Sequence, residues 1–255
     1  MEQTTLAARQ FGAAASDYLT SAAHAQGEDL RRLTVMARAA PGMVALDLGC
    51  GAGHAAFALA GGGAAVTACD LAPEMLAVVA DEARRRGLDV RVQQAPAERL
   101  PFQDASFDLV FSRFSAHHWA DVPAALREVA RVLRRGGHLA MIDVVAPETP
   151  QFDTLLQAVE ILRDASHVRD YRVSEWDAML CAAGFAAPVA DTWRLPLDFA
   201  AWIGRMRTPP ARAAAVRDLF AVAPGAARRY FAVQPDGSFS VDVAWMQSRV
   251  AALST

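Results

Sequence analysis

Between residues 43 and 145 the chain alternates short apolar runs with longer amphipathic stretches rich in alanine, leucine and arginine. Short apolar runs are typical of buried strands and the amphipathic stretches of helices, so the alternation predicts βαβ units and a mostly parallel sheet. The positions of glycine and proline agree with this alternation, since Pro73 suits the first turn of a helix and Gly87 suits the end of one. Strands are expected at 43–48, 64–70, 89–93, 107–112 and 138–145, and helices at 53–61, 73–86 and 121–134.

The segments on either side of this core follow other patterns. Residues 1–40 predict one or two helices, with Phe11, Tyr18 and Leu30 as inward contacts. The alternation at the end of the chain predicts a hairpin around a Pro235-Asp236-Gly237 turn, which would add an antiparallel strand to the sheet. The remaining elements expected beyond residue 150 are helices at 152–166 and 174–183, a strand at 188–196, helical material over 198–230 and hairpin strands at 230–233 and 239–243. No repeat or linker separates the halves, so a single domain is expected over 1–255.

The first predicted strand ends in an acid and a glycine-rich turn, Asp47-Leu48-Gly49-Cys50-Gly51-Ala52-Gly53. Residues without a Cβ let the backbone pass close to a ligand, so the turn predicts a nucleotide-like cofactor. Its Gly-x-Gly-x-Gly spacing differs from the Gly-x-Gly-x-x-Gly of dinucleotide enzymes. Asp47 lies in a buried strand and therefore needs partners, either loop amides or the positive end of the cofactor. The alternative is a tight turn without a ligand.

A second acid, Asp70, closes the next predicted strand, 17 residues after Gly53. A carboxylate at this place in an α/β fold can accept hydrogen bonds from both hydroxyls of a ribose. Because Ala72-Pro73 follows as a helix start would, the alternative is an N-cap or a solvated loop acid.

The composition of the chain argues against several functional classes. The chain has 255 residues, 53% of them hydrophobic, and a formal charge of −3 without a dense arginine run, which argues against a nucleic-acid partner. No apolar stretch approaches the roughly 20 residues of a membrane span and the N-terminus lacks a signal pattern, so no membrane association and a cytoplasmic location are expected. The cysteines, Cys50, Cys69 and Cys181, fit neither a disulfide framework nor metal-ligand spacing, and no metal site is expected.

All 25 basic residues are arginine. A P-loop, a Schiff-base lysine and the Tyr-x-x-x-Lys pair of short-chain dehydrogenases are therefore excluded.

Four segments match the motifs of one family in order: 44–53 with the glycine turn, 68–76 (Ala-Cys-Asp-Leu-Ala-Pro-Glu-Met-Leu), 95–102 with 106–110 (Ala-Pro-Ala-Glu-Arg-Leu-Pro-Phe and Ser-Phe-Asp-Leu-Val), and 127–137. They resemble class I S-adenosylmethionine-dependent methyltransferases, with Arg135 where a proline is usual, a departure expected to alter only the turn. The resemblance implies a Rossmann-like three-layer α/β sandwich with a mostly parallel seven-stranded sheet that ends in an antiparallel strand, plus N-terminal helices and a helical elaboration. It divides the chain into an N-terminal lid (1–40), a cofactor-binding core (41–147) and a part that carries the acceptor pocket (148–255).

The resemblance also implies which residues bind S-adenosylmethionine. The glycine turn would wrap the methionine and ribose, Asp70 would hold the ribose hydroxyls, and Leu71 and Met75 would pack on the adenine. Tyr18 and His24 would belong to the lid, or alternatively make core or surface contacts. The expected cofactor-binding set is Tyr18, His24, Asp47, Gly49, Cys50, Gly51, Gly53, Asp70, Leu71, Met75, Pro96, Ala97, Glu98, Ser112, Arg113 and His117; Pro96 stands where many relatives carry an aspartate.

The segment after the fourth predicted strand ends in His117-His118-Trp119 and resembles the Methyltransferase-11 type, which is related to the ubiquinone and menaquinone C-methylating enzymes. A histidine with a pKa near neutrality can take a proton from an acceptor, which makes His117 and His118 candidate catalytic residues, His117 first. The alternative is that both bond the loop backbone and shape the pocket. Methyl transfer from a positively charged sulfur can proceed by positioning and exclusion of water alone.

The expected function is methyl transfer to a small-molecule acceptor by a monomer or homodimer. Candidates for the acceptor pocket are His167, Arg169, Tyr171 and Arg172, otherwise a solvated turn, and Trp202, Met206 and Trp245, otherwise core. Two other functions stay open: a nicotinamide-dependent NAD(P) oxidoreductase, which the glycine spacing and the missing lysine disfavour, and a non-catalytic cofactor-binding module.

Overall fold

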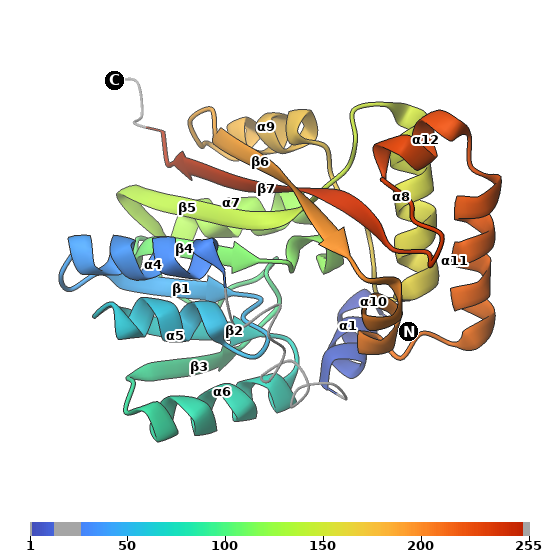
Figure 1. Cartoon of the computed structure of the whole chain (residues 1–255). Coiled ribbons are helices and arrows are strands. Elements are labelled where there is room, and N and C mark those ends of the chain that lie inside the picture. Colours follow the sequence, from blue (N-terminus) through green and yellow to red (C-terminus); the bar gives the residue numbers. More distant parts are fainter. Residues whose placement is uncertain (1, 13–26, 252–255) are drawn as a thin grey trace.

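The computed structural model describes residues 2–12 and 27–251, in which helices cover a seven-stranded sheet (Figure 1). The strand order is β3-β2-β1-β4-β5-β7-β6. β1 to β5 pair in parallel, whereas β7 runs antiparallel to both β5 and β6. The strands are β1 (Val44–Leu48), β2 (Ala65–Asp70), β3 (Val90–Gln94), β4 (Phe107–Arg113), β5 (Leu133–Val145), β6 (Val189–Leu197) and β7 (Phe239–Arg249).

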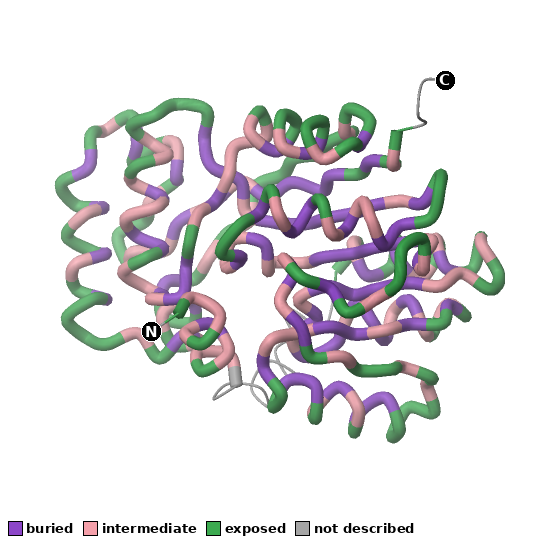
Figure 2. The backbone as a smooth tube through the Cα atoms, turned by 180° about the vertical axis from the view of Figure 1, so that it is seen from behind, coloured by how far each residue is buried: buried purple, intermediate pink, exposed green. Residues whose placement is uncertain are grey.

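Alternate residues of the same strands bury opposite faces of this sheet, because successive side chains of a strand point to opposite sides. Ala45 and Phe111 belong to one core cluster, and their chain neighbours Leu46 and Val110 belong to the other. Figure 2 shows the buried centre of the molecule, which the inner strands of the sheet form, whereas the edge strands β3 and β6 are largely exposed. The first face is covered by α4 (Glu28–Ala39), α5 (His54–Gly61) and α6 (Pro73–Arg86), and the second by α7 (Val122–Val132) and α9 (Val173–Ala182).

A further group of helices lies beyond the carboxyl ends of the parallel strands (Figure 1). It consists of α1 (Gln3–Gly12), α8 (Pro150–Arg163), α10 (Phe199–Arg205), α11 (Pro210–Val222) and α12 (Gly225–Tyr230). A single 3₁₀ turn, η1 (Ala116–His118), follows β4. Within the described ranges, no helix combines the length and apolar character of a membrane span.

The fold class is confirmed, but the expected terminal hairpin is wrong. Residues 230–233 form no strand: α12 ends at Tyr230, and the amide of Phe231 still donates to the carbonyl of Ala227. β7 instead pairs with β5 and β6 over 11 residues. The expected helical stretch over 198–230 is three helices, the helix expected at 152–166 ends at Arg163, and β5 begins at Leu133 rather than 138.

Two of the four motif segments hold each other in place. Glu128 of α7 accepts the amide hydrogen of Leu100 at 2.8 Å. Arg131, one turn further along α7, donates to the carbonyls of Leu100 (3.0 Å) and Phe102 (2.8 Å) and forms an ion pair with Glu128. These contacts fix the segment 95–102 against α7, which covers the second face of the sheet.

We expect Arg131→Met to lower the free energy of unfolding by about 2 kcal/mol, because hydrogen bonds to charged groups contribute about 1.5–3 kcal/mol. Arg135→Met removes an exposed arginine at the start of β5, four residues further along the chain, and is the matched control. Urea unfolding of both variants measures the difference. If Arg131→Met and Arg135→Met unfold with the same free energy, the contacts of Arg131 with Leu100, Phe102 and Glu128 contribute nothing to stability.

Candidate cofactor and acceptor site

A cavity of about 930 Å³ opens at the carboxyl ends of β1 and β4, where the strand order reverses. Ligands of open α/β sheets bind at such a switch point, and the volume is at the upper end of the range for small-molecule sites. The loops after β1, β2, β3 and β4 line one end, and α1, α8, α10, β6 and β7 line the other. Of the expected cofactor residues, those that line it are Asp47, Gly49, Cys50, Gly51, Asp70, Leu71, Met75, Ala97, Glu98, Arg113 and His117.

The glycine turn is anchored to the neighbouring strand. The amides of Gly49 and Cys50 both donate to the carbonyl of Cys69, at 2.8 and 3.0 Å. Gly49 has φ +69°, and a Cβ there would lie 1.9 Å from the hydroxyl oxygen of Ser115. The turn after β1 and the turn after β4 therefore touch, and only glycine fits between them.

Asp47 is buried at the end of β1, and its Oδ2 accepts the amide hydrogen of Ala56 in the first turn of α5 at 2.9 Å. Burial raises the pKa of Asp47 from 3.8 to about 7, and this hydrogen bond opposes the rise only in part. A cationic group near Asp47 would restore its charge.

Asp70 is the last residue of β2 and bonds the loops on both sides of it. One carboxylate oxygen accepts the amide of Gly51 and the other the amide of Ala72, both at 2.9 Å. Each oxygen keeps a second lone pair for a ligand hydroxyl. Burial raises the pKa of Asp70, although these amides oppose it. The alternative of a simple loop acid accounts for the bond to Ala72 but not for the carboxylate's place in the cavity wall.

Glu98 lines the cavity, but its carboxylate already has backbone partners. Its Oε1 accepts the amide hydrogens of Ala120 (2.8 Å) and Asp121 (3.2 Å) and so links the loop after β3 to the loop after β4. Leu71, Met75 and Ala97 supply the apolar wall beside it.

Several expected cofactor residues lie elsewhere. Pro96, Gly53 and Ser112 do not line the cavity. A Cβ on Gly53 would lie 2.8 Å from Val79, so this glycine permits the packing of α5 on α6. Tyr18 and His24 lie outside the described residues. Arg113 reaches the cavity wall and forms an ion pair with Asp29 of α4.

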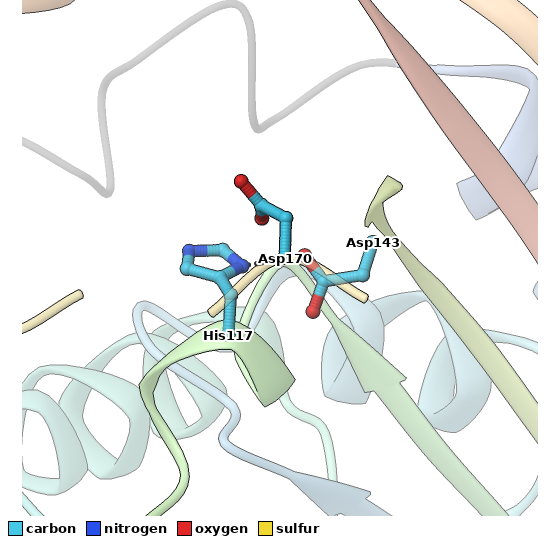
Figure 3. Close-up of side chains that lie close together, drawn as sticks. All are labelled: His117, Asp143 and Asp170. Atoms are coloured by element: carbon cyan, nitrogen blue, oxygen red, sulfur yellow. Dashed lines mark hydrogen bonds and ion pairs between the residues drawn. The ribbon is translucent and has the colours of Figure 1, made fainter. Parts of the chain in front are cut away.

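His117 of η1 makes a short hydrogen bond to Asp143 of β5, with 2.5 Å between Nδ1 and Oδ1 (Figure 3). Burial opposes protonation of the ring, but the Asp143 carboxylate outweighs it and raises the pKa of His117 to about 9. A ring that holds its proton at neutral pH donates hydrogen bonds and does not act as a general base.

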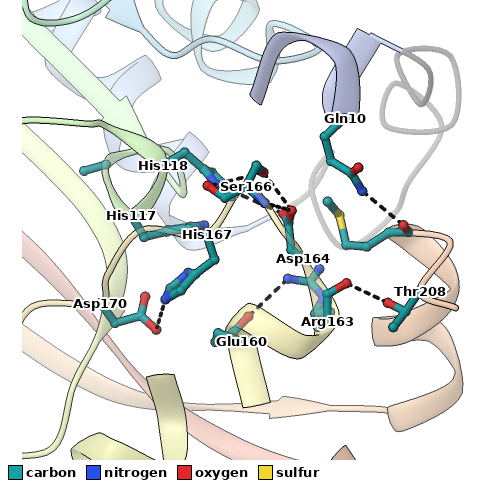
Figure 4. A network of polar contacts seen from close by, with 12 residues as sticks. Gln10, His117, His118, Glu160, Arg163, Asp164, Ser166, His167, Asp170 and Thr208 are labelled. Atoms are coloured by element: carbon teal, nitrogen blue, oxygen red, sulfur yellow. Dashed lines mark hydrogen bonds and ion pairs between the residues drawn. The ribbon is translucent and has the colours of Figure 1, made fainter. Parts of the chain in front are cut away.

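His118 makes structural contacts (Figure 4). Its Nδ1 donates to the carbonyl of Ser166 at 3.0 Å, and its ring meets Phe11 of α1 edge to face with 4.7 Å between centroids. Burial lowers the pKa of His118 to about 3, so the ring is neutral. These contacts favour the pocket-shaping alternative for His118.

The sequence reasoning missed four buried acids near the end of the cavity away from the glycine turn: Glu160, Asp164 and Asp170 line it, and Asp143 lies behind its wall against His117. Asp143 accepts the amide of Ala116 at 2.9 Å as well as bonding His117. Asp143 lies inside the apolar run 139–145, just as Asp47 lies inside the first apolar strand. This position could have identified Asp143 from the sequence as a buried acid that needs partners. Of the other three acids, Glu160 lies in α8 between apolar residues, and Asp164 and Asp170 lie in the polar segment after it; none belongs to a motif, and all four acids are buried.

Trp202, Met206 and Trp245 line the cavity and are also buried. The other group of acceptor candidates does not line it: His167 is buried and bonds Gln157 at 3.1 Å, and Arg169 pairs with Asp153 at 2.9 Å. Arg172 pairs with Glu175 at 2.8 Å, and Tyr171 packs on Trp176.

Comparison with known proteins agrees with this geometry. The family model Methyltransf_11, described as a methyltransferase domain, matches residues 46–141. YafE of Escherichia coli is 46% identical over 201 residues, which cover 78% of this chain and 97% of YafE. The demethylmenaquinone methyltransferase of Thermus thermophilus is 41% identical over 109 residues, 42% of this chain and half of that protein.

The methyltransferase YcgJ of Bacillus subtilis is 40% identical over 203 residues, covering 79% of this chain and 80% of YcgJ. The crystal structure of YcgJ superposes with a TM-score of 0.81 and covers 87% of this chain and 99% of that one. Of the Rossmann-type functions left open by the sequence, these matches decide against the nicotinamide oxidoreductase. The chain belongs to the class I S-adenosylmethionine-dependent methyltransferases of the Methyltransf_11 family.

Proposed function

We propose that this methyltransferase transfers the methyl group of S-adenosylmethionine to a small molecule with an apolar body and a polar end, bound at the far end of the 930 Å³ cavity. One observation carries the proposal: the cavity continues from the glycine turn to a wall of buried side chains. Trp202 and Trp245 are each 2% exposed, and Asp170 is also 2% exposed. A folded macromolecule cannot bring a reacting atom to such a wall, whereas a small molecule can.

The cofactor end supports a specific set of roles. Asp70 is placed to bind the ribose hydroxyls with its remaining lone pairs, and Leu71, Met75 and Ala97 are placed to pack on the adenine. Asp47 is placed to attract the ammonium group of the methionine part, which would relieve the cost of its burial.

The acceptor end supports catalysis by positioning. Sulfur that carries a positive charge activates the methyl carbon, so an acceptor atom held in line with that carbon, away from water, suffices. The aromatic wall would hold the apolar body of the acceptor. The polar groups at His117, Asp143 and Asp170 would fix its reacting end.

Both halves of the chain build this cavity, which supports one domain over 1–255 rather than two. β7 pairs with β5 along eight positions, and α1 contributes Thr4, Ala7 and Phe11 to the cavity wall. The cavity-lining residues of α1 are the observation that supports the expected role of residues 1–40 as a lid over the cofactor.

We expect Asp70→Ala to weaken binding of S-adenosylhomocysteine more than tenfold, because two hydrogen bonds to a charged group are lost and each contributes about 1.5–3 kcal/mol. Asp89→Ala removes an exposed acid before β3 and is the control. Calorimetric titration measures both. Unchanged affinity in Asp70→Ala, or no binding to the wild type, would contradict the site.

Asp47→Asn should stabilise the protein without cofactor and weaken cofactor binding. Each pKa unit corresponds to about 1.4 kcal/mol, so a pKa raised from 3.8 to about 7 costs the ionised form roughly 4 kcal/mol. This cost is absent below pH 3.8 and complete above pH 7, so the advantage of asparagine should grow between pH 5 and pH 8, by roughly 2.7 kcal/mol. Urea unfolding at the two pH values measures it.

Asp108→Asn is the control, and we expect it to change the free energy of unfolding in the opposite direction. Burial opposes ionisation of Asp108, but the Val44 amide and the Arg134 guanidinium outweigh it and lower the pKa of that carboxyl. Its substitution should destabilise the protein at pH 8. If both variants shift stability in the same direction, the burial cost assigned to Asp47 is wrong.

A small-molecule acceptor can be tested with methyl-labelled S-adenosylmethionine and a fractionated bacterial extract. We expect label to enter the fraction that passes an ultrafilter, with wild-type protein and not with Asp70→Ala. Label in the protein or nucleic-acid fractions would contradict the proposed acceptor class. Cofactor binding without transfer to any fraction would favour the non-catalytic module.

A further inference from the structure

Three side chains that are far apart in the sequence meet in or against the wall of the acceptor end (Figure 3). They are His117 of η1, Asp143 of β5 and Asp170 of the segment between α8 and α9. One ring nitrogen of His117 and one carboxylate oxygen from each aspartate lie within 4.8 Å of one another. Their sequence separations of 26 and 27 residues match no metal-ligand motif, which is why the sequence predicted no metal.

Asp170 gives the second observation. Its side chain is 98% buried, and its Oδ2 accepts no hydrogen bond from any described residue. The nearby Nε2 of His167 is 3.9 Å away and is already hydrogen-bonded to Oε1 of Gln157 at 3.1 Å. A buried carboxylate oxygen without a partner costs free energy, and a cation in the cluster would remove that cost.

The neighbouring arginines are held by other acids, so the only cationic group in the cluster itself is the His117 ring, which must release its proton to solvent before a metal ion can bind. Glu160 is paired with Arg163 at 3.4 Å (Figure 4). Arg169 is paired with Asp153 at 2.9 Å. Asp143 shares its charge with His117 and with the amides of Ala116 and Val144. Each oxygen of a carboxylate can accept a further ligand through a remaining lone pair.

We propose that His117, Asp143 and Asp170 bind one divalent transition-metal ion at the acceptor end of the cavity. One imidazole and two carboxylates suit zinc, manganese, iron(II) or cobalt(II). Ligand bonds of about 2.0–2.2 Å place ligand atoms roughly 3.3 Å apart in a tetrahedral site. The longest separation in the cluster must therefore contract by up to about 1.5 Å, which rotation of Asp170 can supply because no bond holds its Oδ2. The ion displaces the proton that His117 shares with Asp143, since only a neutral ring binds a metal.

Three protein ligands leave coordination positions open, as in catalytic rather than structural metal sites. On the proposed function, an oxygen of the acceptor fills one of them. Coordination fixes the place of that oxygen and favours its deprotonated, nucleophilic form. The metal proposal itself does not require an identified acceptor.

The test uses full-length protein treated with a chelator and titrated with cobalt(II) alone. We expect saturable uptake of one equivalent with d–d absorption bands in the visible range. Asp170→Asn should weaken cobalt(II) binding at least tenfold while unfolding at the same or a higher temperature, because it removes a carboxylate with an unpartnered oxygen. Asp164→Asn is the matched control: it makes the same change at a buried acid of the same wall outside the cluster and should keep the affinity.

Absence of saturable binding, or equal affinity in wild type and Asp170→Asn, would overturn the proposal. Equal weakening by Asp164→Asn would also overturn it, because the pocket would then attract cations without a defined site. Titration of the chelator-treated protein with S-adenosylhomocysteine separates the metal proposal from the proposed function. If its affinity is unchanged by the treatment, the cofactor site does not depend on the metal site.

Discussion

The site depends on the carboxyl ends of β2, β1, β4 and β5 meeting at one edge of a parallel sheet. There, an acid of one strand holds the loop of its neighbour. Asp70 of β2 binds the amide of Gly51 in the loop after β1, and Asp143 of β5 binds the amide of Ala116 in the turn after β4. Parallel strands make this arrangement because all their exit loops lie on the same side.

The same acids make the empty site costly. Burial raises the pKa of Asp47, of Asp70 and of Asp170. When the pKa of a buried carboxyl is raised, ionising that carboxyl in the folded protein costs free energy. The ionised form is nevertheless the one that binds cations and accepts hydrogen bonds from ligand hydroxyls. Ligands that bring cationic groups or hydroxyl donors restore the ionised form, so binding and stability are coupled in this protein. The amide bonds that orient these carboxylates keep them in place until a ligand arrives.

The sequence brought together the acid and glycine residues that line one end of the cavity because their signals are local. A strand, an acid and three glycines occur within ten residues, and the fold then determines where they lie. The hairpin prediction failed because Phe231 and Val233 alternate as they would in a strand but follow directly on α12, which ends at Tyr230. The strand that pairs with β7 along eight positions, β5, is about 100 residues away in the sequence. The cluster of His117, Asp143 and Asp170 was missed for the same reason, since only the packed sheet and the α8–α9 segment bring these residues together.

The two ends of the cavity are under different constraints. The cofactor end is built largely from backbone: the turn passes so close to Ser115 that Gly49 admits no Cβ, and amides satisfy its acids. The acceptor end is built from side chains that pack on one another, such as Trp202 on Phe239 with 5.0 Å between ring centroids and Arg163 over the face of Trp202. Side chains on α8, α10 and β7 can change without moving β1 or its loop. Family motifs therefore account for the end of the cavity at the glycine turn, whereas on the proposed function the aromatic wall and the polar groups around His117 would select the acceptor.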